Sequence, residues 1–182
     1  MLPQDQIVRL GLESDVKIDA AVVEEIAIRK QAPSARKDTE RYLAKSEHTV
    51  SQLRKFLLDK KYLEQVIEDT LEWAELSNLV DDERFASIFL RSHSDNSPMG
   101  TYRIRAELRR RGIKEGIIES VLEEHDDSKL SEILIRTVKN RYAHLDHDKA
   151  YRRAAGYLRR RGFNSDLIMM VLKSVFNDQE RT

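Results

Sequence analysis

Arginine has the most distinctive placement in this chain, and its planar guanidinium binds phosphates or carboxylates through paired hydrogen bonds. Residues 103–111 contain five arginines and one acid, Glu107, and residues 149–161 contain six basic residues and no acid. Residues 64–83, in contrast, contain eight acidic residues and no base. The chain has 32 basic and 32 acidic residues, so its formal net charge is zero. Because the charges are sorted by segment, local potentials indicate a binding function better than the sum does.

A repeated pattern of apolar residues accounts for the positions of these charged segments. The pattern occurs three times, offset by 51 residues from Leu53 to Ile104 and by 50 from Ile104 to Ala154. Its members are Leu53, Leu57, Tyr62, Val66, Ile67 and Leu71; then Ile104, Leu108, Ile113, Ile117, Ile118 and Leu122; then Ala154, Leu158, Phe163, Leu167, Ile168 and Leu172. The spacing predicts two amphipathic helices per copy. A further helix is expected before each pair, over residues 34–45, 82–93 and 128–143.

The sequence therefore predicts an all-α fold of tandem three-helix repeats that form an elongated, curved array. We expect an N-terminal extension over residues 1–33, repeat 1 over 34–80, repeat 2 over 81–126, and repeat 3 with a C-terminal tail over 127–182. Alternation between residues 7 and 18 predicts a small β-hairpin in the extension. Asp19 is the expected N-cap of a helix to about residue 30, and Pro33 is expected to start another helix that runs to about residue 45.

The turn between the two helices of each copy holds glycine in copies two and three, at Gly112 and Gly162. Glycine suits the left-handed residue that ends a helix. Copy one has Lys61 at this position, where the left-handed conformation costs a non-glycine residue about 1–2 kcal/mol.

The middle helix of each copy presents basic side chains that we predict to bind a partner. With Ile104 and Leu108 toward the core, Arg103 and Arg110 share one flank, and the rest of the face follows from a turn of about 100° per residue. The candidate residues are Arg103, Arg105, Arg109, Arg110, Arg152, Arg153, Arg159, Arg160, Arg54 and Lys55. Arginines in the last turn also stabilise the helix dipole, which explains part of their placement. That effect does not explain Arg103, Arg105, Arg152 and Arg153, which lie early in their helices.

The acidic residues of the third helices admit more than one interpretation. They can pair with basic helices inside the array, repel nucleic acid and so orient it, or meet a basic partner surface.

Several classes of function lack support in the sequence. There is no glycine-rich phosphate loop and no Gly-x-Ser-x-Gly elbow, so we expect no enzyme and no cofactor. His144 and His147 have a spacing that occurs in metal sites, but a solvated loop explains them better, and we expect no metal. No apolar run could span a membrane, no secretion signal is evident, and the absence of cysteine agrees with the cytoplasm.

The sequence resembles the RecX family. The segment 79–86, Leu-Val-Asp-Asp-Glu-Arg-Phe-Ala, is similar to the signature that opens the middle repeat of that family. The resemblance continues through residues 100–104, Glu107, Leu108 and residues 111–113, and through His48, Thr49 and Leu53. It covers about residues 35–175, and it departs from the family at Lys61, where the family often has glycine.

The resemblance implies a cytoplasmic bacterial regulator of the RecA recombinase with three tandem three-helix units and no catalytic residues. Members bind along the helical groove of the RecA–DNA filament and typically inhibit ATP hydrolysis, strand exchange and co-protease activity. We expect a monomer that binds RecA, with a weaker contact to single- or double-stranded DNA as a coexisting property. The alternative is an autonomous DNA-binding helical protein, in which each helix–turn–helix reads DNA directly.

Overall fold

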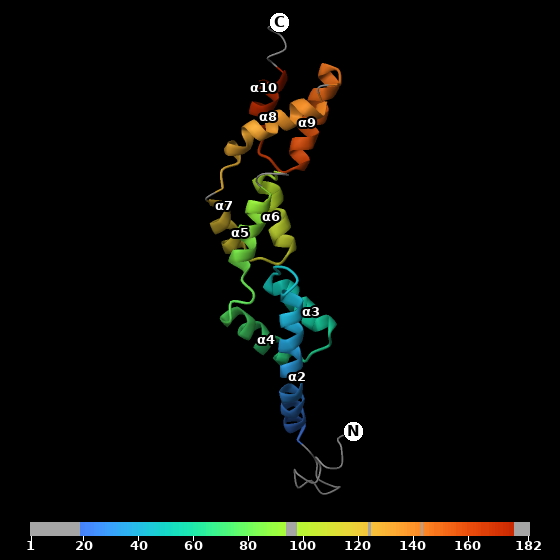
Figure 1. Ribbon diagram of the computed structural model, residues 1–182, viewed down its shortest axis with the longest axis vertical. Coiled ribbons are helices and arrows are strands. Elements are labelled where there is room, and N and C mark those ends of the chain that lie inside the picture. Colours follow the sequence, from blue (N-terminus) through green and yellow to red (C-terminus); the bar gives the residue numbers. More distant parts are fainter. Residues whose placement is uncertain (1–18, 94–97, 124, 143, 177–182) are drawn as a thin grey trace.

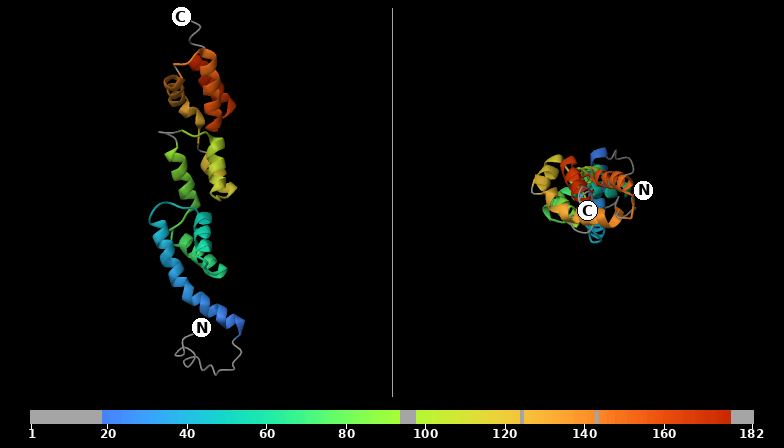
Figure 2. Two further views of the ribbon diagram at one scale, coloured as in Figure 1. Left: turned by 90° about the vertical axis from the view of Figure 1, so that its right-hand side faces the viewer. Right: turned by 90° about the horizontal axis from the view of Figure 1, so that it is seen from above.

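The computed structural model describes residues 19–93, 98–123, 125–142 and 144–176, and within these ranges every regular element is a helix. The molecule is elongated, with α2 at one end and α10 at the other (Figure 1). Viewed along its long axis it has a narrow outline (Figure 2). The expected all-α architecture is confirmed, whereas the predicted hairpin lies outside the described residues.

The helices form three successive groups. Repeat 1 consists of α2 (Ala20–Leu43), α3 (Val50–Asp59) and α4 (Glu64–Leu76). Repeat 2 consists of α5 (Asp82–Ser92), α6 (Thr101–Arg110) and α7 (Glu115–Glu123). Repeat 3 consists of the 3₁₀ turn η1 (Asp127–Leu130), α8 (Ser131–Tyr142), α9 (His147–Arg160) and α10 (Ser165–Phe176).

Helix α2 corrects one expectation, because it runs through Pro33 without a break. A proline inside a helix costs about 3 kcal/mol, since it cannot donate to the carbonyl four residues earlier. Packing offsets this cost, because Ile28 before Pro33 and Ala35 after it pack into the same core. The side chain of Gln31 also accepts a hydrogen bond from the Leu63 amide at the start of α4 (3.0 Å). Asp19 caps the helix as expected, accepting from the Ala21 amide at 3.2 Å.

The turn between the second and third helices has the same backbone in all three repeats. Lys61, Gly112 and Gly162 have φ angles of 62°, 81° and 82°. In each case the following amide donates to the carbonyl five residues earlier, as in Ile113 to Leu108 at 3.2 Å. This is the Schellman pattern of helix termination. The left-handed position of Lys61 confirms the sequence alignment of the three copies.

Buried apolar residues form three separate clusters, one in each repeat. Repeat 1 buries Ala35, Leu53, Leu57, Val66, Ile67, Leu71, Ala74 and Val80. Repeat 2 buries Ala86, Ile104, Leu108, Ile113, Ile118 and Leu122. The cluster of repeat 3 extends from Leu130 to Phe176 and includes Ala154, Leu158, Phe163, Ile168 and Leu172. Because the clusters are separate, the repeats are held together by other contacts.

Those contacts occur at two equivalent joints, where the N-terminus of a second helix meets the turn of the next repeat. At the first joint, between repeats 1 and 2, the Thr49 hydroxyl donates to the Arg111 carbonyl (2.7 Å). The Val50 amide donates to a carboxylate oxygen of Asp82 (2.9 Å).

The second joint, between repeats 2 and 3, repeats this arrangement. The Gly100 amide donates to the Arg161 carbonyl (2.9 Å), and the Tyr102 amide donates to the Gly162 carbonyl (3.2 Å). The Thr101 amide donates to a carboxylate oxygen of Asp127 (3.1 Å). Thr101 is thus the counterpart of Val50, and Asp127 is the counterpart of Asp82.

Both joints require the glycine of the turn for a second reason besides its backbone conformation. A Cβ on Gly112 would lie 2.3 Å from the Ser51 side chain, and one on Gly162 would lie 2.4 Å from the Arg103 amide nitrogen. Lys61 lies in the turn of repeat 1, and its side chain is exposed. A side chain is therefore tolerated at residue 61, where only the backbone conformation is strained.

We predict that Gly162→Ala destabilises the protein by about 2–4 kcal/mol, since it combines a left-handed alanine with a clash against the backbone of α6. Lys61→Gly should instead raise the free energy of unfolding by about 1 kcal/mol, because it relieves backbone strain and removes no joint contact. Urea unfolding measures both. The control is Gly116→Ala, where an added Cβ meets no atom within 4 Å and a neutral or stabilising effect is expected. A wild-type midpoint for Gly162→Ala, or a clear loss for Lys61→Gly, would contradict this account.

Candidate functional site

The arginines of α6 have ion-pair partners on α7. Arg105 bonds to Glu115 and to Glu119, and Arg109 bonds to Glu115 at 2.6 Å. The hydrogen bonds from Arg109 and then Arg105 lower the pKa of Glu115 to about 2. The Arg105 hydrogen bond likewise lowers the pKa of Glu119. These contacts hold the second and third helices of repeat 2 against each other.

Repeat 1 has the same contact at the same positions. Arg54 of α3 bonds to Glu64 (2.6 Å) and to Glu68 of α4. We call this set of contacts the arginine–glutamate bridge: Arg54 with Glu64 and Glu68 in repeat 1, and Arg105 with Glu115 and Glu119 in repeat 2. The bridges show that one of the three interpretations of the acidic third helices, pairing with basic helices inside the array, holds for these glutamates, and they give Arg54 and Arg105 partners within the chain.

Arg103 lies at the second joint. Its guanidinium donates to the Arg160 carbonyl at the end of α9 (3.1 Å). The early position of Arg103 in α6 is unfavourable for its own helix dipole, but its charge meets the negative C-terminal end of α9 in the next repeat. The contact at the second joint therefore explains why an arginine lies early in α6.

A basic hollow of about 540 Å³ lies beside the first joint. Its lining includes three basic residues and one acid, with two aromatic rings: Lys55, Arg110, Arg111, Asp59, Tyr42 and Phe56. Arg110 is 70% exposed and bonds to Glu107 at 2.9 Å. Lys55 is exposed, and among the described residues no carboxylate lies within ion-pair distance of it. The hollow thus brings Lys55 of repeat 1 close to Arg110 of repeat 2, with aromatic rings between α2 and α3.

Helix α9 differs from α6 in the environment of its arginines. Arg152, Arg153, Arg159 and Arg160 are all exposed. Within the described ranges, none of the four has a carboxylate at ion-pair distance; the Arg152 Nε donates to the Asp148 carbonyl (3.3 Å). The two helices that match in sequence therefore differ in the ion pairing of their arginines, because α6 has carboxylate partners for them and the described residues offer none to α9.

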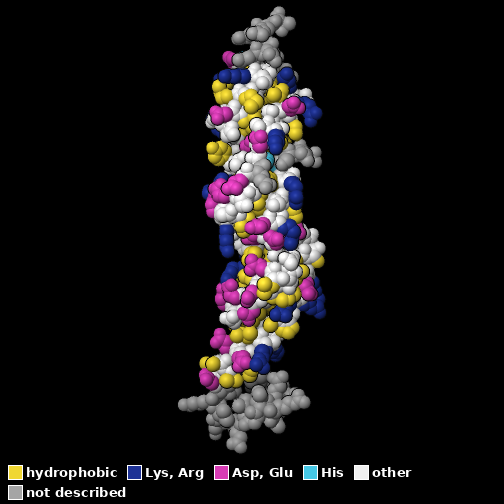
Figure 3. All heavy atoms as spheres, turned by 90° about the vertical axis from the view of Figure 1, so that its left-hand side faces the viewer, with side chains coloured by type: hydrophobic (Ala, Val, Ile, Leu, Met, Phe, Trp, Pro, Cys, Tyr) yellow, Lys and Arg dark blue, Asp and Glu magenta, His cyan; other side chains and the backbone are white. Residues whose placement is uncertain are grey.

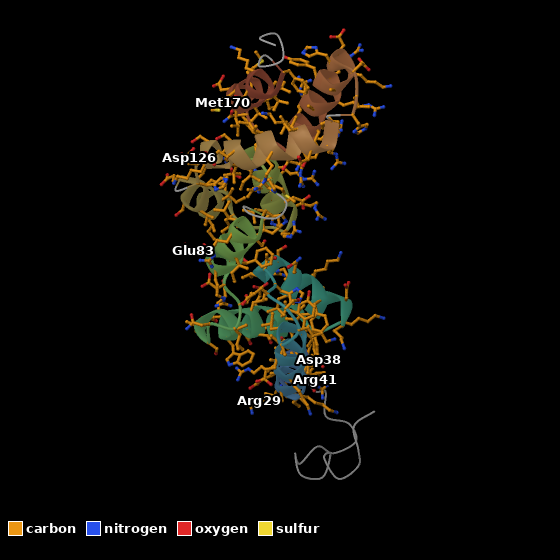
Figure 4. The ribbon with its side chains drawn as sticks, turned by 45° about the horizontal axis from the view of Figure 1, so that its top comes forward. Arg29, Asp38, Arg41, Glu83, Asp126 and Met170 are labelled. Atoms are coloured by element: carbon orange, nitrogen blue, oxygen red, sulfur yellow. The ribbon has the colours of Figure 1, made fainter. Side chains whose placement is uncertain are left out.

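The third helices of repeats 1 and 2, α4 and α7, carry further exposed acidic side chains besides those of the bridges. On the side of the molecule that includes α4 and α7, acidic side chains occur along the length of the surface, interspersed with basic and apolar side chains (Figure 3). Glu83 and Asp126 project on the same side from two different repeats (Figure 4).

Asp82 and Asp127 are functional residues of the joints that the sequence did not single out as such. Each follows an aspartate that caps its own element: Asp81 accepts from the Arg84 amide (2.9 Å) and Asp126 from the Ser128 amide (2.9 Å). Burial raises the pKa of Asp82. The paired aspartates at 81–82 and 126–127 were the available signal, since one caps its own helix and the other caps the preceding repeat.

The histidines considered for a metal site do not gather with other ligands. In the described part of the chain, no group of three or more His, Cys, Asp or Glu residues could hold a metal ion. Nor is any helix there long and apolar enough to cross a bilayer.

Comparison with known proteins identifies the family. Residues 81–122 match the model for the second three-helix domain of RecX, and residues 133–172 match the model for the third. The regulatory protein RecX of Chlorobium phaeobacteroides is 35% identical over 138 residues, which cover 75% of this chain and 89% of that protein. The chain belongs to the RecX family. RecX of Halorhodospira halophila is 33% identical, over 78% of this chain and 88% of that protein.

Solved RecX structures have the same fold. A crystal structure of regulatory protein RecX superposes with a TM-score of 0.72 at 22% identity, covering 93% of this chain and 85% of that one. RecX from Lactobacillus salivarius also gives a TM-score of 0.72, at 20% identity over 81% of this chain and 97% of that one. The tandem three-helix repeats read from the sequence are thus the RecX architecture.

We predict that the bridge in repeat 2 makes stability depend on pH. The folded-state pKa of Glu115, about 2, lies below its ordinary value of 4.5. Its contribution is therefore present above pH 4.5 and is lost as the pH falls toward 2. The melting temperature should fall less between neutral and acidic pH in Glu115→Gln than in the wild type, as measured by thermal unfolding. Glu123→Gln, an exposed carboxyl on the same helix, is the control; equal pH dependence in both variants would contradict the prediction.

Proposed function

We propose that this chain regulates a RecA recombinase by binding along the RecA–DNA filament, and that it lowers ATP hydrolysis, strand exchange and co-protease activity. Membership of the RecX family supports a regulatory role. The observation that carries the finer proposal is the unneutralised basic face of α9 on an elongated, jointed array (Figure 1). An array of this kind can contact several neighbouring subunits of a filament, whereas a compact domain contacts fewer.

The arginines on the outer flank of α9 are the proposed contact. Arg153 and Arg160 are seven residues apart, so they lie two helical turns apart on one face. Both are exposed and have no carboxylate partner among the described residues. Guanidinium groups in this arrangement bind phosphates of the filament DNA or carboxylates of the recombinase with paired hydrogen bonds. In this proposal the chain performs no catalytic step and acts as a cytoplasmic monomer.

A second candidate function is direct binding to free DNA. The hollow at the first joint favours it, since Lys55, Arg110 and Arg111 lie beside the stacked rings of Tyr42 and Phe56. Cations beside aromatic rings are typical of single-strand binding surfaces. The exposed acidic side chains of α4 and α7 oppose wrapping by a polyanion, so this contact is expected to be the weaker one.

The test is co-sedimentation with RecA–single-stranded DNA filaments, with ATP hydrolysis measured in the same samples. Arg153→Glu combined with Arg160→Glu should weaken binding and inhibition on the order of tenfold or more, since two contact charges are reversed. The matched control is Lys30→Glu with Lys37→Glu, which reverses two exposed charges with the same spacing on α2.

Two outcomes would contradict the proposal. If the wild-type chain neither sediments with filaments nor changes hydrolysis, the chain does not regulate RecA in this way. If the folded α9 variant inhibits like the wild type, the contact lies elsewhere. Tight binding of the wild type to bare DNA, with no preference for filaments, would favour the second candidate function.

A further inference from the structure

Repeat 3 keeps the helix register of repeat 2 but lacks the arginine–glutamate bridge. The buried residues of α9 and α10 occupy the positions of those in α6 and α7, as Leu158 does for Leu108 and Ile168 for Ile118. The same register places residue 155 opposite residues 165 and 169, as Arg105 lies opposite Glu115 and Glu119. In repeat 3 these three positions hold Ala155, Ser165 and Met169. All three charged groups of the bridge are therefore missing.

Loss of the acids leaves cations without their internal partners. Arg159 is the counterpart of Arg109, which bonds to Glu115, but residue 165 is a serine and offers no carboxylate. Arg152 lies two turns earlier on the same face of α9, and it is exposed as well. A guanidinium that repeat 2 neutralises is thus open to an external carboxylate in repeat 3.

Loss of the bridge also exposes an apolar side chain at the same place. Met169, in the position of Glu119, is 47% exposed. Met170 is 45% exposed but lies on the side of α10 away from α9 (Figure 4). Between the two arginines, α9 carries the small residues Ala155 and Gly156 on this face, and the flexible Arg160 guanidinium lies 3.2 Å from the position of a Cβ on Gly156. The face formed by Arg152, Ala155, Gly156, Arg159, Ser165 and Met169 is called the open face of repeat 3.

We propose that the open face of repeat 3 binds an acidic, amphipathic segment of a protein partner. The carboxylates of that segment pair with Arg152 and Arg159, and an apolar residue of the segment packs on Met169. This inference rests on the proposed function in one respect, because it names the kind of surface on the regulated partner that repeat 3 contacts.

The chemistry of the open face favours a protein segment over nucleic acid. Methionine is a flexible apolar side chain that adapts to different aliphatic partners, and a phosphodiester backbone offers it none. The arginine–carboxylate geometry is already realised twice in this chain, in repeats 1 and 2. Arg152 and Arg159 lie two turns apart on α9, so an external acidic helix can present a glutamate to each of them without rearranging α9 or α10.

The test closes the open face by rebuilding the bridge. The closure variant combines Ala155→Arg, Ser165→Glu and Met169→Glu, which copies the residues of repeat 2. It should fold, with a melting temperature no lower than that of the wild type, because it adds intramolecular ion pairs at positions that accommodate them in repeat 2. The matched control is Met170→Glu, which changes the net charge by the same single negative unit on the other side of α10.

The first probe is a fluorescein-labelled helical peptide with glutamates on successive turns and leucines between them, measured by fluorescence anisotropy with the full chain. The closure variant should bind the peptide on the order of tenfold more weakly than the wild type, while Met170→Glu should retain wild-type affinity. A labelled single-stranded oligonucleotide is the second probe, and its affinity should be the same for all three proteins.

Each remaining result overturns the inference. The open face is excluded as the site if the wild type and the closure variant bind the peptide equally, or if the wild type does not bind it. It is also excluded if Met170→Glu loses as much affinity for the peptide as the closure variant does. A loss of oligonucleotide binding alone would assign the face to nucleic acid. Co-sedimentation of the same variants with RecA filaments separates the two proposals. If the peptide results hold but the wild type does not sediment, the open face stands and the proposed function fails.

Discussion

The arrangement of the repeats depends on how the first turn of one helix meets the last turn of another. Helix N-termini have amides without intrahelical partners, and helix C-termini have carbonyls without them. At each joint the two sets meet: α3 and α6 present amides and a hydroxyl, and the turns after α6 and α9 present carbonyls. Asp82 and Asp127 complete the pairing from the next repeat. Since the three apolar clusters are separate, these polar contacts fix the spacing and orientation of the repeats.

The joints also explain several residues of the basic helices that end in arginine and glycine. Gly112 and Gly162 terminate their helices and leave room for the preceding repeat. Arg103 contacts the end of α9, and Arg105 belongs to the bridge of repeat 2. Among the described residues the exposed arginines of α9 have no carboxylate partner, so the two basic helices, alike in sequence, differ in how far their arginines are paired within the array.

Much of the fold could be predicted because it follows from local rules. The apolar spacing located the second and third helices, and the alignment placed Lys61 in a left-handed turn, as observed. The continuity of α2 through Pro33 could not be predicted, because it depends on tertiary packing of Ile28 and Ala35. For the same reason the sequence did not reveal that Arg103 and Asp127 serve the second joint, since their partners lie in another repeat. The ten basic candidates remain predictions as partner contacts.

Hydrogen exchange at the joint amides tests this account most directly. Val50 and Thr101 lie in first turns, where amides normally exchange quickly, yet both donate to a carboxylate of the next repeat. The reference is the Gln65 amide in the first turn of α4, whose N-terminus has no side-chain cap. The account predicts that Val50 and Thr101 exchange on the order of a hundredfold more slowly than Gln65 after correction for intrinsic rates. Exchange at the Gln65 rate would show that the joints do not persist in solution and that the repeats are independently oriented.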